Sequence, residues 1–324
     1  MSSYIVGVDV GGTFIKTAIV SWDKRVIGKS SCPTHAQEGP QAVMDAMEGG
    51  VRDLVAQNKI SMSEVMAVGI GAPGPMNWKT GVVYSPPNLA GWKDVPLGTE
   101  MQKRLNVPCF IDNDANAACY GEFWLGAGQG AENMAVLTLG TGVGGGLIVF
   151  GLLLRGEDGT AAELGHLKVQ RDGRLCGCGS RGCLEGYASV TGMVRTAIEA
   201  LESGRSSLIH DLCQGDHARI TGKMIFEAAQ EEDEVALWTF EETATWLGLG
   251  IASIINFQNP EKIVLCGGMI DAGEMLFEPV RRVAKANAFQ VPAERCKIVP
   301  AGLGADSGVL GAAGCALARY EAAN

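Results

Sequence analysis

Two stretches of this chain, about 130 residues apart, follow the same plan of an apolar run, a tight glycine turn and a second apolar run. The first is "YIVGVDVGGTFIKTAIV" at residues 4–20, and the second is "MAVLTLGTGVGGGLIVF" at residues 134–150. Apolar runs of this length on either side of a glycine turn are typical of a buried β-hairpin. The repeat indicates two lobes related by duplication, each containing one such hairpin.

Strands and helices are expected to alternate outside these hairpins. Short apolar runs bounded by turn residues predict strands, and apolar residues three and four positions apart predict helices. The expected elements are strands at 65–71 and 107–112, a short strand within 262–269, and helices at 41–57, 97–105, 241–257 and 307–320. Such alternation in a chain of 324 residues indicates a mixed α/β architecture with two lobes.

The charge pattern disfavours several classes of partner. The formal net charge is −10 and no cluster of Lys and Arg occurs, so neither nucleic acid nor an anionic membrane is an expected partner. The first residues, "MSSYIVGVDVGG", lack the positive region of a signal peptide, and no run approaches the roughly 18 apolar residues of a membrane span. We therefore expect a cytoplasmic protein whose thiols stay reduced.

Two glycine patterns raise the possibility of dinucleotide binding. They are "GIGAPG" at residues 69–74 and "GTGVGG" at residues 140–145. The dinucleotide fingerprint requires its third glycine to open a helix. A proline follows the first pattern at once, and strand-like residues follow the second. The sequence therefore does not support a dehydrogenase.

The two glycine turns are candidate phosphate-binding loops. Successive peptide N–H groups without bulky side chains form nests that bind anions. Asp9 ends an apolar strand, where a carboxylate needs a cation or water as a neighbour, and it could hold Mg²⁺ through water. Either turn alone is explained equally well as a plain glycine-rich hairpin, but two turns with threonines and Asp9 together favour phosphate. The candidate residues are Asp9, Gly11, Gly12, Thr13, Lys16, Gly140, Thr141 and Gly142.

One histidine and three cysteines gather in "ELGHLKVQRDGRLCGCGSRGCLE", residues 163–185. The set of His166, Cys176, Cys178 and Cys183 offers three thiolates and one imidazole, which is typical of a closed tetrahedral zinc site. Disulfides are disfavoured in the expected compartment, and a redox pair of cysteines leaves the histidine unexplained. A zinc ion without an open coordination position is structural, so the sequence predicts a loop fixed by the metal.

The segment "FIDNDANAACYGE", residues 110–122, is expected to end a strand and begin a helix. Phosphoryl transfer to a hydroxyl group needs a carboxylate that accepts the proton and orients the oxygen. Asp112 and Asp114 are both candidates for this base. An aspartate at such a place also suits a helix N-cap, so the motif alone leaves Asp114 open between capping and catalysis.

Four motifs together resemble the ROK family of sugar kinases and sugar-responsive repressors, and its bacterial glucokinase branch most of all. They are "DVGGTFIK", "IDNDANAA", "LGTGVGGG" and "ELGHLKV…CGCGSRGCLE". The resemblance runs along the whole chain and implies the two-lobed actin-like, ribonuclease-H-like (ASKHA) α/β fold with a structural zinc loop. It implies a smaller lobe of residues 1–116, completed by a C-terminal helix at 305–324, a larger lobe of residues 117–304, and an active site in the cleft.

The resemblance also implies roles for single residues. Asp114 matches the catalytic base of the family and Asn113 a contact of the sugar, whereas Asp112 stands where the family often has Glu and receives no chemical role. The remaining sugar contacts implied are Gly74, Asn88, Glu163, His166 and Glu185, and the glycines implied on the adenosine side are Gly267 and Gly268. Two points stay open: Trp92 could stack on a sugar or close the core, and the prolines before Asn88 could merely stiffen a surface loop.

The activity implied is that of an ATP-dependent hexose kinase, with glucose as the expected substrate and ATP, Mg²⁺ and structural Zn²⁺ as cofactors. Kinases for N-acetylmannosamine, N-acetylglucosamine or fructose share these motifs and stay open, as does polyphosphate as the donor. A catalytically silent sugar-binding regulator is disfavoured by the intact Asp114 and glycine turns, and because no helix-turn-helix segment precedes Asp9. A thiol-redox protein would form a disulfide instead of binding zinc. We expect a homodimer or a homotetramer.

Overall fold

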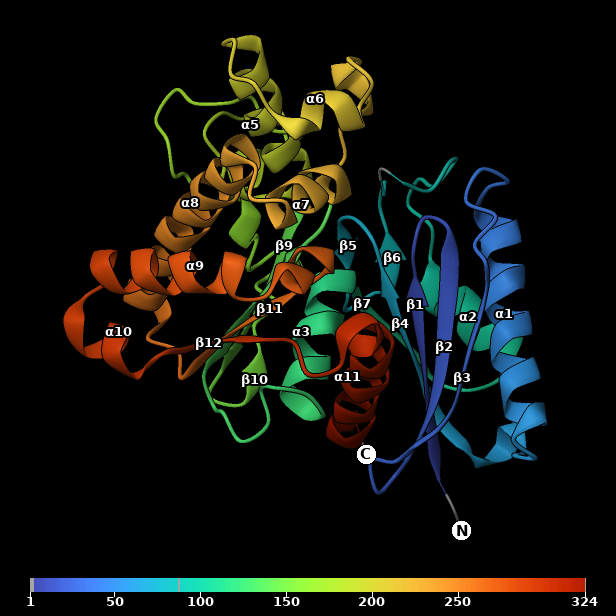
Figure 1. The fold of residues 1–324 in the computed structure, drawn as a ribbon. Helices are drawn as coiled ribbons and strands as arrows, with labels where there is room; N and C mark the ends of the chain where they lie inside the picture. Colours follow the sequence, from blue (N-terminus) through green and yellow to red (C-terminus); the bar gives the residue numbers. More distant parts are fainter. Residues whose placement is uncertain (1–2, 87, 324) are drawn as a thin grey trace. The chain divides into compact units, whose positions relative to one another are not determined.

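The two glycine turns each join neighbouring strands of a five-stranded sheet, in a computed structural model that describes residues 3–86 and 88–323. The first sheet has the order β3 (Val26–Pro33), β2 (Phe14–Ser21), β1 (Tyr4–Val10), β4 (Val65–Ala72) and β7 (Cys109–Asn113) (Figure 1). The second has the order β10 (Leu152–Leu153), β9 (Val143–Val149), β8 (Met134–Leu139), β11 (Lys262–Cys266) and β12 (Lys297–Pro300). The first strand of each hairpin is the central strand, so the sheets correspond strand by strand, as the duplication predicts.

The strand directions also correspond. In the first sheet β1 and β2, and β2 and β3, are antiparallel, whereas β1, β4 and β7 are parallel. In the second sheet β9 and β10 are antiparallel, and β8, β11 and β12 are parallel. The register of the first sheet aligns Asp9 with Lys16 on one side and, through Gly71, with Asp112 on the other. Charged side chains of three strands are thereby collected at one edge of the sheet.

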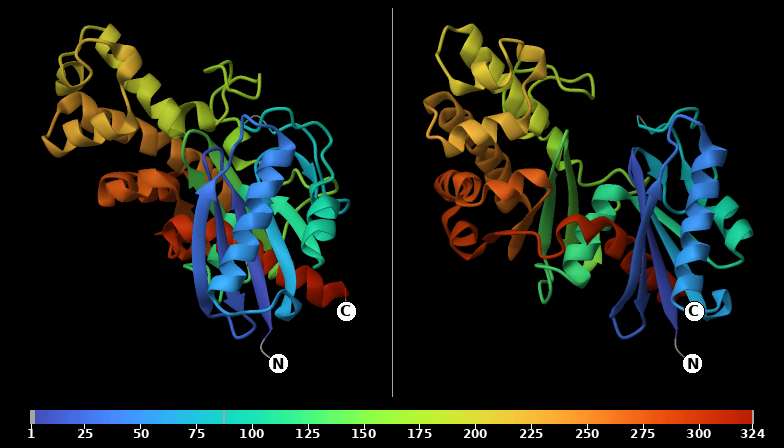
Figure 2. Two further views of the ribbon diagram at one scale, coloured as in Figure 1. Left: turned by 90° about the vertical axis from the view of Figure 1, so that its right-hand side faces the viewer. Right: turned by 45° about the vertical axis from the view of Figure 1, so that its right-hand side comes forward.

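Helices cover both faces of the first sheet. The helices α1 (Pro40–Gln57) and α2 (Leu97–Leu105) lie on one face, and α11 (Ser307–Ala323) lies on the other (Figure 2). The strand alternation explains this, because successive side chains point to opposite faces. In β1, Val6 and Val8 join the core beneath α1 and α2, while Ile5 joins the core beneath α11.

The helix α11 approaches its neighbours so closely that only glycines fit at four contacts. A Cβ on Gly7 would lie 1.9 Å from the carbonyl oxygen of Val309, and one on Gly69 would lie 1.8 Å from that of Ala312. The helix α3 (Asp114–Trp124) packs on α11 in the same way, because a Cβ on Gly311 would lie 1.6 Å from the carbonyl oxygen of Ala117. The fourth such contact is made by Gly121, which faces the carbonyl oxygen of Ser307. These contacts bring backbone against backbone.

The remaining elements are short or helical. Two strands, β5 (Met76–Asn77) and β6 (Val82–Val83), form a small hairpin. The 3₁₀ turns are η1 (Met62–Glu64), η2 (Leu164–His166), η3 (His217–Arg219), η4 (Gly268–Ala272) and η5 (Gly304–Asp306). The other helices are α4 (Glu185–Ala188), α5 (Val190–Glu202), α6 (Leu208–Leu212), α7 (Gly222–Gln230), α8 (Glu234–Gln258), α9 (Glu274–Asn287) and α10 (Gln290–Arg295). Among the residues described, no helix combines the length and apolarity that crossing a membrane requires.

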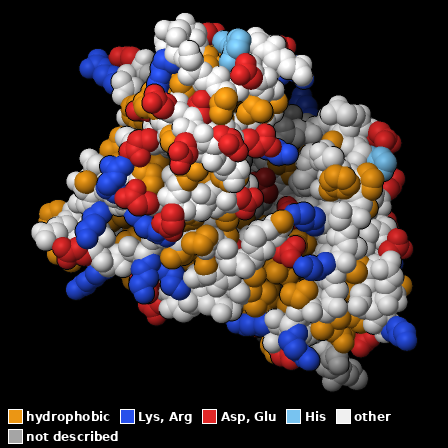
Figure 3. All heavy atoms as spheres, in the orientation of Figure 1, with side chains coloured by type: hydrophobic (Ala, Val, Ile, Leu, Met, Phe, Trp, Pro, Cys, Tyr) orange, Lys and Arg blue, Asp and Glu red, His pale blue; other side chains and the backbone are white. Residues whose placement is uncertain are grey.

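The chain divides into two compact units. Unit 1 comprises residues 1–131, 146–162 and 301–324, and unit 2 comprises residues 132–145 and 163–300. The boundary passes through β9, so each unit is built from more than one segment of the chain. Acidic and basic side chains are interspersed over the helices of unit 2 on the face seen in Figure 3. The lobe limits at residues 116 and 305 remain a prediction.

The expected elements are present, with ends shifted by a few residues. Helix 241–257 is the second part of the longer α8, which ends at Gln258 and is followed by the C-cap residue Asn259 in the left-handed conformation. Five small or apolar residues that follow the helical spacing in this part, Ala244, Leu247, Gly248, Ile251 and Ile255, are all buried. The elements that were not anticipated are the helices α4 to α7, α9 and α10 and the strands β3, β5, β6, β10 and β12.

We predict that Gly311→Ala lowers the free energy of unfolding by about 3 kcal/mol or more, because the new methyl group must displace the backbone of α3. The matched control is Gly49→Ala in α1, where an added Cβ meets nothing within 4 Å. That change should stabilise the protein by about 0.5–1 kcal/mol, the helix preference of alanine over glycine. Urea unfolding of both variants measures the difference. Equal stability of the two variants would contradict the close packing.

Candidate active site and metal centre

The first glycine turn is held from its carbonyl side by one threonine. The hydroxyl of Thr34 donates to the carbonyl oxygen of Gly11 at 2.7 Å, and its N–H donates to that of Thr13 at 2.9 Å. In a trans peptide the C=O of one residue and the N–H of the next point in opposite directions. The N–H of Gly12 therefore points away from Thr34. The turn presents N–H on its other side, as an anion nest requires.

The second glycine turn is held in the same way. The N–H of Val190 donates to the carbonyl oxygen of Gly140 at 2.9 Å, and the hydroxyl of Thr191 donates to that of Thr141 at 2.8 Å. The N–H groups of Thr141 and Gly142 consequently point away from α5. Two consecutive donors on one side of a turn favour a phosphate ligand over a plain hairpin.

Asp9 and Lys16 are neighbours across the first hairpin. Burial raises the pKa of Asp9, and the positive charge of Lys16 opposes that rise. The ammonium group of Lys16 donates to the carbonyl oxygen of Ala305 at 2.6 Å, which holds it beside the first turn of α11. Gly308 leaves room for the carboxylate, because a Cβ there would lie 2.8 Å from Oδ2 of Asp9. A buried carboxylate in this setting fits a cation site.

The cap of α3 belongs to Asn113 and not to Asp114. Oδ1 of Asn113 accepts the N–H groups of Ala115 at 2.9 Å and Asn116 at 3.3 Å. Asp114 is the first residue of the helix, and its side chain is exposed. The alternative that Asp114 serves as the N-cap is therefore wrong. The cap uses the oxygen of Asn113, so its amide N–H₂ is the end that suits a sugar hydroxyl.

The predicted sugar loop of unit 1 is only partly described, since Pro87 lies outside the described residues. Gly74 has φ +85°, and a Cβ there would lie 2.7 Å from Cα of Pro86, so only glycine fits. Asn88 lies next to the first glycine turn, 3.8 Å from the Cβ position of Gly12. The indole of Trp92 is buried in the core beneath α1 and α2. Of the two roles left open for Trp92, stacking on a sugar or closing the core, the structure therefore favours the core.

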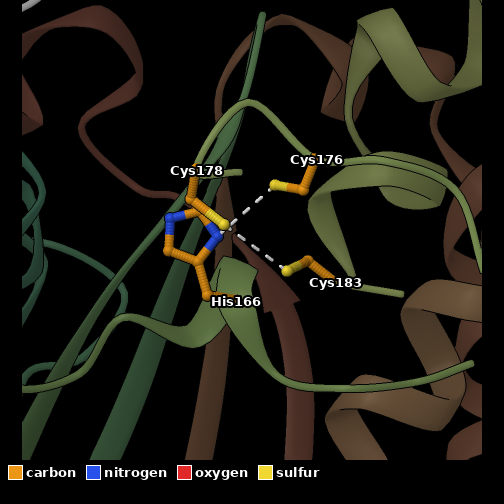
Figure 4. A group of neighbouring side chains, drawn as sticks. All are labelled: His166, Cys176, Cys178 and Cys183. Atoms are coloured by element: carbon orange, nitrogen blue, oxygen red, sulfur yellow. Dashed lines mark hydrogen bonds between the residues drawn. The ribbon is translucent and has the colours of Figure 1, made fainter. Parts of the chain in front are cut away.

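The four predicted metal ligands come together in unit 2. His166, Cys176, Cys178 and Cys183 offer ligand atoms that all lie within 4.8 Å of one another (Figure 4). The sulfur atoms of Cys178 and Cys183 are 3.8 Å apart, and Nδ1 of His166 is 3.7 Å from the sulfur of Cys176. A tetrahedral site with Zn–S bonds of about 2.3 Å places its sulfur atoms about 3.8 Å apart. The donor set and its spacing thus fit zinc, whereas a disulfide needs about 2.05 Å.

The zinc loop has a backbone shaped for this cluster. Gly179 and Gly182 have φ of +84° and +74°, and a Cβ on Gly182 would lie 1.7 Å from the carbonyl oxygen of Gln170. The ammonium group of Lys168 lies 3.0 Å from the sulfur of Cys183, where it offsets the negative charge of thiolates. Nδ1 of His166 faces the sulfurs, so Nε2 points elsewhere and lies 4.0 Å from Oε2 of Glu163.

Glu185 connects the zinc loop to the second glycine turn. Its Oε2 accepts the N–H of Val143 at 3.0 Å, and its Oε1 accepts the thiol of Cys176 at 3.2 Å. A Cβ on Gly142 would lie 2.4 Å from Oε2, so the glycine makes this approach possible. Cysteine binds zinc as a thiolate, so Cys176 would no longer donate to Oε1 once it binds the metal. The contact with the glycine turn could not be read from the sequence.

The predicted adenosine side lies beside a cavity of about 350 Å³ in unit 2. Gly267 has φ +95°, and a Cβ on Gly268 would meet nothing within 4 Å, which leaves space for a ligand. The cavity is lined by Val190, Met193, Gly222, Lys223, Phe226, Phe240, Gly268, Met269, Asp271 and Ala272. Apolar walls with a few polar groups suit a nucleotide base and ribose. Except for Gly268, these residues were not predicted from the sequence, because they lie on separate elements that only the fold brings together.

Comparison with known proteins places these features in one family. The model of the ROK family matches residues 5–319. The glucokinase of Halalkalibacterium halodurans is 39% identical over 95% of this chain and 93% of its own, and that of Thermotoga maritima is 37% identical over 95% and 96%. The crystal structure of a ROK family glucokinase from Streptomyces griseus, in complex with glucose and AMPPNP, is 36% identical with a TM-score of 0.81. It covers 98% of this chain and 100% of its own.

We predict that Cys178→Ser removes the metal site. Wild-type protein should carry about one zinc per chain and the variant almost none, because three ligands no longer close the tetrahedron. The freed loop should be cut faster by trypsin at Arg171, Arg174 or Arg181. Metal analysis and timed proteolysis measure both effects. Cys296→Ser is the control, since this cysteine lies outside the cluster and should leave zinc content unchanged. Full zinc in the Cys178 variant would contradict the assignment.

Proposed function

This chain belongs to the ROK family, and we propose that it is a glucokinase that transfers the γ-phosphoryl group of ATP to the 6-hydroxyl of glucose. The observation that carries this function is the similarity to glucokinases along 95% of the chain, including one crystallised with glucose and AMPPNP. The fold provides the parts that the reaction needs: two anion nests, a buried carboxylate and an exposed one.

Asp114 is the base in this proposal. Its carboxylate accepts the proton of the 6-hydroxyl and orients the oxygen in line with the γ-phosphorus. The first residue of a helix suits this role, because the positive end of the helix favours the ionised carboxylate. Its exposure allows direct contact with a substrate. The capped turn at Asn113 fixes the direction of the side chain.

The two glycine turns bind the phosphates. In the first turn the groups are Gly11, Gly12 and Thr13, and in the second they are Gly140, Thr141 and Gly142. The N–H groups of Gly12, Thr13, Thr141 and Gly142 stabilise charge on the phosphoryl oxygens without moving during the reaction. Those of Gly11 and Gly140 close the turns, since they donate to the carbonyl oxygens of Phe14 and Gly142 at 3.0 Å. Mg²⁺, when bound, supplies charge neutralisation between the phosphates. Asp9 would hold it, and Lys16 adds a positive charge on the same edge of the sheet.

The hexose hydroxyls are assigned to acceptors and donors that the family resemblance indicates. These are Gly74, Asn88, Asn113, Glu163, His166 and Glu185. Carboxylates accept hydrogen bonds from two adjacent hydroxyls, and a histidine that binds zinc through Nδ1 keeps Nε2 for a sugar. The zinc is structural in this assignment, because four protein ligands leave it no open position. It fixes the loop that carries the two glutamates and the histidine.

Gly267, Gly268 and the cavity beside them receive the adenosine of ATP. The cavity of about 350 Å³ falls within the range of small-molecule sites. A cytoplasmic location follows from the need for ATP and for reduced thiols at the zinc site. A homodimer or homotetramer is part of the same proposal.

The substrate is tested with a coupled assay of ADP release. The panel consists of glucose, N-acetylmannosamine, N-acetylglucosamine, fructose and mannose with ATP and Mg²⁺, repeated with polyphosphate as the donor. We expect glucose with ATP to lead in kcat/KM by at least about tenfold. A lead by another sugar would move the protein to a sister activity of the same fold. Absence of turnover with every sugar in zinc-loaded protein would overturn the proposed function.

We predict that Asp114→Asn lowers kcat by about 10²- to 10⁴-fold, the usual contribution of a general base. The affinity for glucose should change by no more than about threefold, since the amide retains the shape of the carboxylate. Initial rates and calorimetric titration with glucose separate the two effects. Asp45→Asn on α1 is the control and should leave both unchanged, because Asp45 is an exposed surface residue. A kcat within tenfold of wild type would exclude Asp114 as the base.

A further inference from the structure

Asp112 has no part in the mechanism above, yet its carboxylate is buried and fully hydrogen-bonded close to the proposed base. It lies in β7, two residues before Asp114, and is only 3% exposed. A buried carboxylate is costly unless hydrogen bonds and an opposite charge compensate it. The surroundings of Asp112 supply both.

Four donors converge on this carboxylate. Oδ1 accepts the N–H of Asn113 at 3.1 Å and the amide of Asn116 at 3.3 Å. Oδ2 accepts Nε of Arg155 at 2.7 Å and lies 2.7 Å from its Nη2. The first two donors, Asn113 at the end of β7 and Asn116 in the first turn of α3, lie on either side of Asp114. The carboxylate therefore ties this segment to a guanidinium group from a distant part of the chain.

The guanidinium group is itself held in place. Arg155 lies over the ring of Trp78, at 4.9 Å from its centroid, and its side chain is only 14% exposed. Burial lowers the pKa of Arg155, but Asp112 together with Cys315 and Tyr120 raises it, and the net shift is upward. Arg319 lies over the same ring at 5.1 Å and donates to the carbonyl oxygen of Ile111 at 3.3 Å. Arg155 and Arg319 thus both lie over the indole of Trp78. They bind two consecutive residues of β7, since Arg155 binds the carboxylate of Asp112 and Arg319 binds the carbonyl oxygen of Ile111.

We propose that Asp112 and Arg155 are positioning residues that fix the turn bearing Asn113 and Asp114 for phosphoryl transfer. The inference rests on the proposed function. The pair lies within unit 1 and touches no reacting atom, so it acts through the backbone N–H of Asn113 and the side chain of Asn116. Because a displacement of about 1 Å at a reacting group costs on the order of 100-fold in rate, the pair is expected to affect kcat more than binding.

The experiment compares Asp112→Asn, Arg155→Lys, Arg155→Met and the double variant Asp112→Asn/Arg155→Met. Arg155→Lys keeps a positive charge beside Asp112 but loses the two contacts that the planar guanidinium group makes with the carboxylate. It therefore offers a variant that folds if the others do not. Asp158→Asn is the control, because Asp158 lies in the same loop and is exposed. Each variant is measured for kcat, for KM of glucose and ATP, and for thermal unfolding.

We expect kcat to fall about 10- to 100-fold in the single Asn and Met variants and about tenfold in Arg155→Lys, with both KM values within about threefold of wild type. The double variant should be no slower than the slower single one, since both residues act through one contact. The control should keep the wild-type kcat. Lower thermal stability with a wild-type kcat per folded molecule would overturn the proposal, and so would a change confined to KM.

A second measurement does not depend on activity. Amide hydrogen exchange of peptides covering residues 113–124 should speed up in Arg155→Lys relative to wild type, while peptides from α1 stay unchanged. If wild-type protein phosphorylates no sugar, the proposed function fails, but this exchange still decides whether the pair fixes the turn. Unchanged exchange in residues 113–124 would overturn the positioning role by itself.

Discussion

The contact of α11 with its neighbours is the constraint on which unit 1 depends. Glycines on β1, β4, α3 and α11 let backbones meet at distances that no side chain permits. A packed interior cannot yield at such contacts without large shifts, so the positions of these elements are fixed together. Asp114, the proposed base, lies at the start of α3, and Asp9 lies near the end of β1, so both take their places from this arrangement. Glu122 strengthens it, since its buried carboxylate accepts the N–H groups of Gly302 and Leu303, which precede α11, and the hydroxyl of Ser307, the first residue of α11.

The two glycine turns are held by the same kind of hydrogen bond, from a threonine hydroxyl to a carbonyl oxygen of the turn. Glycine gives a turn its conformational freedom, but freedom alone does not direct N–H groups toward a ligand. In both turns a threonine hydroxyl from another segment binds a carbonyl oxygen, and the opposite N–H is thereby aimed outward. In unit 2, Glu185 adds a bond to Val143 and thus joins the turn to the zinc loop. Loss of zinc is therefore expected to disturb the glycine turn as well as the loop.

The metal centre and the Asp112–Arg155 pair solve a similar problem in different ways. Each holds an irregular segment, which lacks the repeating hydrogen bonds of a helix or sheet. The zinc loop uses four ligands and glycines in the left-handed conformation. The turn before α3 uses a buried ion pair and a helix cap. In each case one group that fixes the backbone, His166 in the zinc loop and Asn113 before α3, is also proposed to contact the sugar.

The sequence by itself determined the features that depend on near neighbours in the chain. The hairpins follow from apolar runs around glycine turns, and the ligand set follows from closely spaced cysteines and one histidine. It did not determine that Asn113 rather than Asp114 caps α3, because the two are adjacent and both residue types favour the cap position. Nor did it indicate Thr34, Thr191 or Arg155, or the residues that line the cavity beside Gly268. Those residues act on segments distant in the chain, and only tertiary packing decides which distant side chain reaches a given carbonyl or carboxylate group.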